Sequence, residues 1–195
     1  MYATESPSTA TITDDGIITA ISPGTTNITV ASADGHVTVT LPVYVIASWE
    51  EENMTFHSPL LTSGNYIKGL DYTNTTVSWI QDHITTSYTL EFYNPQGEIL
   101  QNTDTVGTEC TMHVYDHNHV LQYVYTFLLY GDVNGDGKIN STDLLVLQRH
   151  ILEIEKLQGS FLISGNLSKN GKNPSSLDSL LIQRHILEFS MINQS

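Results

Sequence analysis

Residues 131–143 read GDVNGDGKINSTD, and this stretch decides the fold of the C-terminal third of the chain. Its oxygen-bearing side chains recur at alternate positions of a twelve-residue loop that begins at Asp132, has Gly137 at the sixth position and ends at Asp143. Ca²⁺ takes about six to eight oxygen ligands, and alternate residues of a tightly turning loop can all point inward. The predicted ligands are Asp132, Asn134, Asp136, the backbone carbonyl of Lys138, Asn140 and Asp143.

The residues that follow this loop occur twice. Residues 144–153 read LLVLQRHILE and residues 177–189 contain SLLIQRHILE, so the hexapeptide QRHILE recurs 35 residues later. Because apolar residues follow helical spacing in both copies, we expect two helices. We expect Thr142 or Asp143 to cap the first one. Residues 123–130, before the first loop, are predicted to form a strand, so each helix has a loop before it but the first loop has no entering helix.

The second loop offers fewer oxygen ligands than the first. If Asp178 is placed at position 12, Leu167 falls at position 1, whereas a shift by one residue gives a largely neutral set of ligands. Ligand charge is a main determinant of calcium affinity. We therefore expect one strong calcium site, with the second loop binding weakly or not at all. The shifted set consists of Asn166, Ser168, Asn170 and Asp178.

A calcium loop with an exit helix, duplicated at the C-terminus, resembles a type I dockerin over about residues 130–195. The resemblance implies an all-α, non-catalytic, calcium-dependent module that docks onto a cohesin module of a scaffold or another secreted protein. Family recognition residues lie at loop positions 10 and 11 and on the exit helix. The corresponding residues here are Ser141, Thr142, Leu145, Val146, Arg149 and Glu153. The residues alone would be equally consistent with a solvated helix start and face. In the second repeat positions 10 and 11 are Ser176 and Leu177, so we expect the first-repeat face to be preferred.

Residues 1–45 alternate between polar and apolar residues, in short segments separated by Asp-Gly and Pro-Gly turn sequences. This pattern predicts antiparallel strands. The phrase ATITDDGIITAISPGTTNITV resembles the later strands of a bacterial Ig-like group 2 domain, whose first strands would precede Met1. The resemblance implies an all-β spacer or adhesive arm.

Residues 46–130 are predicted to form a small α+β module, similar to the β-grasp-like accessory units that precede dockerins in surface proteins. We expect a short helix over residues 75–84 and strands over residues 88–93, 98–100, 111–115 and 119–129. The single cysteine, Cys110, is expected to be a half-buried strand thiol. The sequence HVYDHNH contains His113, His117 and His119, and a polar turn is favoured over zinc binding.

Charge is distributed unevenly along the chain, which has 21 acidic residues against 7 Lys and Arg. Residues 1–130 carry about −13, while residues 131–195 are near neutral. An acidic surface opposes binding to nucleic acid or anionic membranes. No apolar run reaches the roughly 18 residues of a membrane span, and no signal peptide is visible in this chain. Glu50, Glu51 and Glu52 are interpreted as a linker charge run.

The sequence therefore predicts three domains, over residues 1–45, 46–130 and 131–195. We expect a non-enzymatic tail of a larger secreted bacterial protein, extracellular or on the cell surface. The larger protein would be a polysaccharide- or glycan-degrading enzyme or a surface protein, in a cellulosome-like assembly. The alternative is a structural stalk or adhesin arm that calcium rigidifies without a cohesin partner. That alternative predicts that Ser141, Thr142, Leu145 and Arg149 pack against the 46–130 module.

Overall fold

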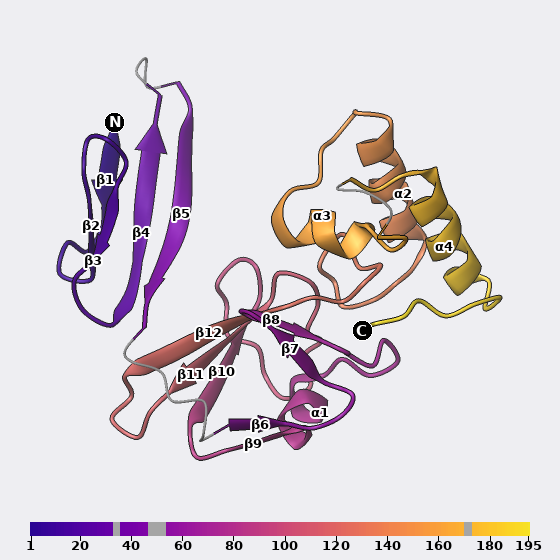
Figure 1. Cartoon of the computed structure of the whole chain (residues 1–195), viewed down its shortest axis with the longest axis horizontal. Helices are drawn as coiled ribbons and strands as arrows, with labels where there is room; N and C mark the ends of the chain where they lie inside the picture. The colour runs from indigo at the N-terminus through magenta and orange to yellow at the C-terminus, as the bar shows by residue number, and fades with distance from the viewer. Residues whose placement is uncertain (33–35, 47–53, 170–172) are drawn as a thin grey trace. The chain divides into compact units, whose positions relative to one another are not determined.

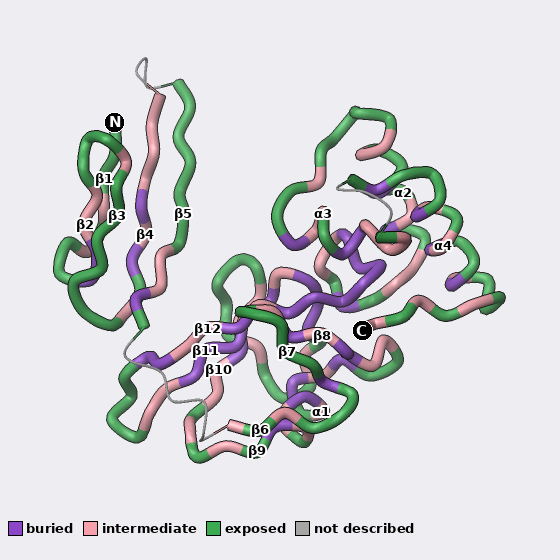
Figure 2. The backbone as a smooth tube through the Cα atoms, in the orientation of Figure 1, coloured by how far each residue is buried: buried purple, intermediate pink, exposed green. Residues whose placement is uncertain are grey.

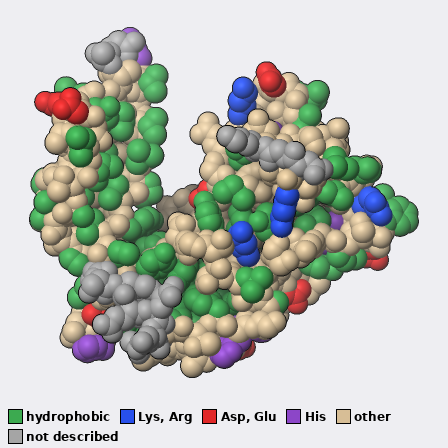
Figure 3. Space-filling model, in the orientation of Figure 1, with side chains coloured by type: hydrophobic (Ala, Val, Ile, Leu, Met, Phe, Trp, Pro, Cys, Tyr) green, Lys and Arg blue, Asp and Glu red, His purple; other side chains and the backbone are tan. Residues whose placement is uncertain are grey.

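The computed structural model describes residues 1–32, 36–46, 54–169 and 173–195. The chain divides into two compact units, which are Met1–Asn53 with Ser87–Leu90 and His113–Val124, and Met54–Thr86 with Glu91–Met112 and Tyr125–Ser195. The predicted linker charge run Glu50–Glu52 and the predicted second-loop ligand Asn170 lie outside the described residues. Figure 3 shows Lys and Arg side chains on the second unit, in agreement with the uneven charge of the sequence.

The first unit contains short antiparallel strands. These are β1 (Tyr2–Thr4), β2 (Ala10–Ile12), β3 (Ile18–Ala20), β4 (Gly24–Ala31) and β5 (Thr38–Val45). Strand β4 lies between β1 and β5 and pairs antiparallel with both, while β2 and β3 form a hairpin (Figure 1). The antiparallel strands predicted for residues 1–45, at residues 9–12, 17–21, 26–30 and 36–45, are confirmed as β2–β5, and β1 was not expected. The assignment of residues 1–45 to a bacterial Ig-like domain stays a prediction.

The main sheet has the strand order β10-β11-β12-β8-β7. The elements are β6 (Met54–Phe56), β7 (Leu61–Ser63), β8 (Tyr66–Lys68), α1 (Val77–Asp82), β9 (Ile84–Thr86), β10 (Thr89–Tyr93), β11 (Thr111–Tyr115) and β12 (Leu121–Phe127). Strand β12 pairs parallel with β8. Phe92 stacks on Phe127 with ring centroids 5.9 Å apart, and Ile67 of β8 and Met112 of β11 are fully buried.

Three helices follow the main sheet, α2 (Ser141–Ile151), α3 (Gly159–Gly165) and α4 (Ser176–Ile186). Helices α2 and α4 pack on each other through a buried cluster of Val133, Leu147 and Ile182. These residues belong to the buried segments drawn in purple in Figure 2. Leu147 and Ile182 occupy equivalent positions of the two repeats, so the duplicated helices meet through duplicated residues.

Several local expectations are corrected by the structure. Helix α2 is capped by Asn140, not by Thr142 or Asp143, and Asp143 instead completes a capping box from the third helical position. Residues 98–100 form only an isolated bridge between Tyr93 and Ile99 rather than a strand. Helix α3 and strands β6–β9 were not expected, because these segments are too short for a periodic pattern.

The repeated QRHILE hexapeptide ends both helices in the same way. The residues after the two C-caps, Glu153 and Glu188, have left-handed backbones, with φ of 59° and 58°. The next N–H reaches back to the carbonyl of Arg149 in one copy and of Arg184 in the other, at 2.9 Å in both. This 6→1 bond is that of a Schellman-type helix end. The hexapeptide shared by the two copies therefore forms the same C-terminal capping motif in both.

The histidine of the hexapeptide also has one structural role in both copies. His150 Nδ1 accepts the N–H of Leu157 at 2.9 Å, and His185 Nδ1 accepts the N–H of Ile192 at 3.3 Å. Each histidine thus ties the chain seven residues further on back to its helix. His185 is buried under the ring of Tyr72, with centroids 4.7 Å apart, and burial lowers its pKa.

The buried helix contact predicts a large stability difference between two neighbouring positions of α4. Ile182→Ala should lower the free energy of unfolding by about 2–5 kcal/mol, because it leaves a cavity at a fully buried site. The matched control is Leu180→Ala, whose side chain is 47 % exposed. Urea unfolding followed by helical circular dichroism measures both. Equal losses in the two variants would contradict the packing described here.

The buried histidine predicts acid sensitivity of the C-terminal repeat. Since the folded pKa of His185 lies below its unfolded value of 6.5, its stabilising contribution is complete above that pH and is lost as pH falls. Wild-type protein in saturating calcium should lose stability between about pH 7 and pH 5. His185→Asn, which retains an acceptor but does not titrate, should lose less. pH-dependent thermal melts of the two proteins measure this, and an unchanged loss of stability in His185→Asn would contradict the role of this histidine.

Candidate metal centre

The first loop is organised around the carboxylate of Asp132. This side chain is fully buried. Its Oδ1 accepts the N–H of Gly135 at 2.7 Å, and its Oδ2 accepts the N–H groups of Gly137 at 3.2 Å and Thr108 at 2.9 Å. Gly137 at loop position 6 has φ of 75°, as the sharp turn there requires. The first predicted ligand is therefore held in place by backbone donors, one of which comes from outside the loop.

Asp143, at position 12, closes the loop from the other end. It is also fully buried, and its Oδ1 accepts the N–H of Val133 at 3.0 Å while its Oδ2 accepts that of Asn140 at 2.9 Å. The second bond is half of the α2 capping box. One carboxylate thus joins the loop start to the helix start.

The remaining predicted ligands form a chain of short local turns. Asn134 Oδ1 accepts the N–H of Asp136 at 3.0 Å, Asp136 Oδ1 accepts that of Lys138 at 2.9 Å, and Asn140 Oδ1 accepts that of Thr142 at 2.7 Å. Each side chain folds back over its own backbone two residues on. This is the local geometry that brings alternate side chains to one side of a loop.

Burial of the two aspartates and repulsion between the loop carboxylates disfavour their ionised forms, which a bound cation would stabilise. Burial, with a smaller contribution from Asp143, raises the pKa of Asp132 to about 7 against the lowering effect of its N–H donors. Burial also raises the pKa of Asp143 to about 6, with a contribution from Asp136. Among the described residues, no basic side chain forms an ion pair with either carboxylate. A cation would fit this donor set.

The donor set is of mixed type rather than purely acidic. Within the described part of the chain, no group of three or more His, Cys, Asp or Glu side chains is placed so that it could hold a metal by itself. Calcium in this loop would depend on amide and carbonyl oxygens as well as carboxylates, as the ligand spacing of the sequence also implies.

The second loop makes the same closing hydrogen bonds as the first but has a different residue at its first position. Asp178 is fully buried, and it accepts the N–H of Ser168 at 2.7 Å and that of Ser175 at 2.7 Å. These donors lie 35 residues after Val133 and Asn140, the donors to Asp143. The bonds therefore fix the unshifted register, in which Leu167 replaces Asp132.

The electrostatics of the two loops differ accordingly. Burial acts to raise the pKa of Asp178, but hydrogen bonds from Ser168 and Ser175 outweigh it and hold the pKa below its ordinary value. The Ser175 hydroxyl adds a further bond at 2.8 Å. Hydrogen bonds thus prevail over burial at Asp178, whereas at Asp132 and Asp143 burial prevails over the bonds from their N–H donors and the pKa is raised.

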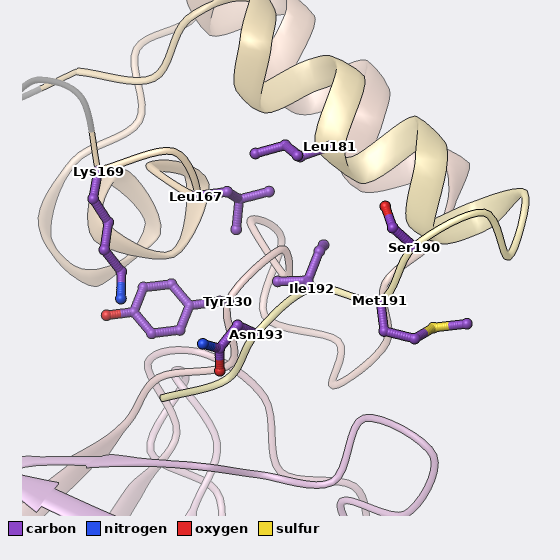
Figure 4. Close-up of a pocket in the computed structure, with 8 residues that line it drawn as sticks. All are labelled: Tyr130, Leu167, Lys169, Leu181, Ser190, Met191, Ile192 and Asn193. Atoms are coloured by element: carbon purple, nitrogen blue, oxygen red, sulfur yellow. The ribbon is translucent and has the colours of Figure 1, made fainter.

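A pocket of about 330 Å³ with both apolar and polar lining residues lies beside the second loop, where Leu167 occupies the position of a ligand. Figure 4 shows Leu167, Leu181 and Ile192 around it, with Lys169 extended toward the ring of Tyr130. The Lys169 Nζ lies 5.3 Å from that ring centroid and donates to the carbonyl of Ser195 at 2.9 Å. The second repeat is stabilised here by packing of the C-terminal tail.

The predicted recognition residues are mostly exposed. Ser141, Thr142 and Glu153 face solvent, Leu145 is 55 % exposed, and the Arg149 side chain is 48 % exposed. Val146 differs, because it is partly buried against the Val133–Leu147–Ile182 cluster. Glu153 lies beyond the end of α2, in the left-handed turn rather than on the helix.

The other candidate sites have structural explanations. The HVYDHNH segment contains a turn in which Asp116 and Val120 close the β11–β12 hairpin, with His119 stacked on Tyr115. His113 instead is buried within β11, against the ring of Tyr44. Cys110 is fully buried just before β11, not half-buried within a strand, and burial raises its pKa to about 11.

Comparison with known proteins places residues 130–187 in the family described as the dockerin type I domain. A stretch of 25 residues is 76 % identical to the cellulase/esterase CelE of Acetivibrio thermocellus, and covers 13 % of this chain and 3 % of that relative. No solved structure matches the chain. None of the described helices has the length and apolar character needed to cross a membrane.

Proposed function

Because residues 130–187 are a type I dockerin domain, we propose that this chain is a calcium-dependent docking segment that binds a cohesin module through the exposed face of α2. Type I dockerins as a family bind calcium and cohesin modules. The observation that supports the proposal most directly is one of position. Two buried carboxylates, Asp132 and Asp143, lie in the loop that begins α2, and most of the predicted contact residues of that helix face solvent.

In this proposal the first loop couples metal binding to presentation of the helix. Bound calcium supplies the positive charge that the buried carboxylates lack. Asp143 bonds to both Val133 and Asn140, so holding its carboxylate ionised also holds the cap of α2. Metal binding and the folding of this segment are then one linked equilibrium.

We propose one strong calcium site in the first loop and a weak or absent one in the second. The unshifted register supports this, since Leu167 brings no oxygen side chain to the first position. The shifted ligand set of Asn166, Ser168 and Asp178 would have to compete with the bonds that Asp178 already makes.

The partner face that we propose has an apolar centre and a charged edge. Leu145 supplies exposed apolar surface and Arg149 a guanidinium, with Ser141 and Thr142 as small hydroxyl groups at the helix start. This composition matches a protein–protein interface with a buried centre and polar rim. Arg149 has to exchange its exposed ion pair with Glu155, at a cost that is small for surface pairs. Val146 contributes less than its sequence position implied.

The alternative of a calcium-rigidified stalk is less well supported. It predicted that Ser141, Thr142, Leu145 and Arg149 pack against the upstream module, and all four are exposed. Their exposure favours a surface left open for a partner.

The wider context is also part of the proposal. We place this segment in a larger secreted bacterial protein, extracellular or on the cell surface, engaged in polysaccharide or glycan degradation within a cellulosome-type assembly. The relative with the 25-residue match is named a cellulase/esterase, which supports this context. The upstream β-rich residues 1–45 and the module over residues 46–130 act in it as a non-catalytic spacer and support.

Removing calcium should abolish docking. EDTA, or Asp132→Ala combined with Asp136→Ala, should eliminate binding to type I cohesin modules and lower the melting temperature, because the loop loses its neutralising ion or its ligands. Surface plasmon resonance against a cohesin panel, with and without calcium, measures this. Asp178→Asn is the matched control in the second loop and should retain calcium-dependent binding. Undiminished cohesin affinity in EDTA would refute the proposal.

The two helix faces should contribute unequally to cohesin binding. Leu145→Ala with Arg149→Ala removes the proposed apolar centre and charged contact, and should weaken binding at least about a hundredfold if both are hot spots. The matched variant Leu180→Ala with Arg184→Ala changes the equivalent residues of α4 and should have little effect. A larger loss in the α4 variant would assign the preferred face to the second repeat.

A further inference from the structure

A loop of the upstream module lies directly against the calcium loop. Residues 105–109, here called the bracing loop, precede β11 and belong to the same compact unit as α2–α4. The Thr108 N–H donates to Asp132 Oδ2 at 2.9 Å, the Thr105 hydroxyl donates to the carbonyl of Asp136 at 3.4 Å, and Glu109 Oε1 accepts the N–H of Ser160 at 2.9 Å. The bracing loop therefore reaches both the calcium loop and the start of α3.

Gly107 permits the closest part of this approach. A Cβ atom added to Gly107 would lie 2.5 Å from Gly137 N and 2.6 Å from both Asp132 Oδ2 and the carbonyl of Gly135. Real Cβ atoms do not come so close. Gly107 is not in a left-handed conformation, so its backbone would accept any residue. Proximity to the calcium loop is what requires glycine here.

The bracing loop is itself held rigidly by the upstream module. The Val106 N–H donates to the carbonyl of Thr75 at 2.8 Å, and the Thr108 hydroxyl bonds to both the N–H and the carbonyl of Leu129. Thr75 also donates its hydroxyl to the carbonyl of Gly137 at 3.2 Å. The donor to Asp132 is thus positioned by contacts within the upstream module.

We propose that the bracing loop is a wall of the calcium site, in which Thr108 and Gly107 act as positioning residues that hold Asp132 and set the calcium affinity. Calcium binding then stabilises the upstream module, and the upstream module strengthens calcium binding by the same factor, because linkage between the two is reciprocal. The inference rests on the proposed calcium site at residues 132–143 and extends it to residues outside the dockerin domain.

Substitution at Gly107 tests the wall directly. In the full chain, Gly107→Ala should weaken calcium binding about tenfold or more in isothermal titration calorimetry, because the methyl group forces the Thr108 donor away from the carboxylate. Gly97→Ala is the control in the same module. Its added Cβ meets nothing within 4 Å, although its positive φ of 82° makes alanine costly for the module. It should leave the calcium affinity unchanged.

A milder variant covers the case in which Gly107→Ala does not fold. Thr75→Val with Thr105→Val removes two hydroxyl donors to the calcium-loop carbonyls while keeping side-chain shape, and should weaken calcium binding about threefold. Hydrogen exchange gives a second readout on the wild-type protein. Calcium should slow exchange of the Thr108 amide, and Asp132→Asn should abolish that effect.

The outcomes separate the two proposals. Wild-type calcium affinity in both the Gly107 and the double threonine variants, with no calcium effect on the Thr108 amide, overturns the bracing loop and leaves the calcium site intact. Failure of the wild-type protein to bind calcium overturns the proposed function itself. Weakened affinity in both variants with normal affinity in Gly97→Ala supports the inference.

Discussion

The structure of the C-terminal half depends on how one buried carboxylate is satisfied. No cationic side chain of the described residues pairs with Asp132, which is surrounded by N–H groups from its own loop and from Thr108 of the upstream module. Leaving such a group without these donors would be costly in a buried setting. The carboxylate therefore joins two segments that the sequence separates, and it makes them parts of one site.

The two copies of the repeat share their backbone hydrogen bonds but differ in the side chain at the first loop position. Asp143 and Asp178 make equivalent bonds, and both copies of QRHILE stop a helix with a glutamate in a left-handed turn. The difference lies at the first loop position, where Leu167 in one copy takes the place of Asp132 in the other. The first copy therefore contains two buried carboxylates whose pKa values are raised by burial, and the second contains one carboxylate held by hydrogen bonds together with apolar packing.

The sequence was informative wherever local chemistry determines structure. The duplicated helices and the helix at residues 75–84 could be predicted, because helical periodicity acts over a few positions. The helix cap was misplaced by two residues or more, since Asn140 and Asp143 share a capping box and only geometry assigns their roles. The Thr108 donor could not be foreseen. It depends on long-range folding of the upstream module, and nothing in the GT dipeptide at 107–108 indicates a contact 24 residues away.

The C-terminal tail has a consequence for the order in which a ribosome-made chain can assemble. The side-chain amide of Gln194 accepts the N–H of Tyr130 and donates to the carbonyl of Tyr130, and the backbone carbonyl of Gln194 accepts the N–H of Gly69. Translation proceeds at about 5–20 residues per second, so these contacts form seconds after the strands they join have emerged. The contact of Thr108 with Asp132 is available much earlier. In the nascent chain the contact between Thr108 and the first loop can therefore form first, and the contacts of Gln194 with Tyr130 and Gly69 form later.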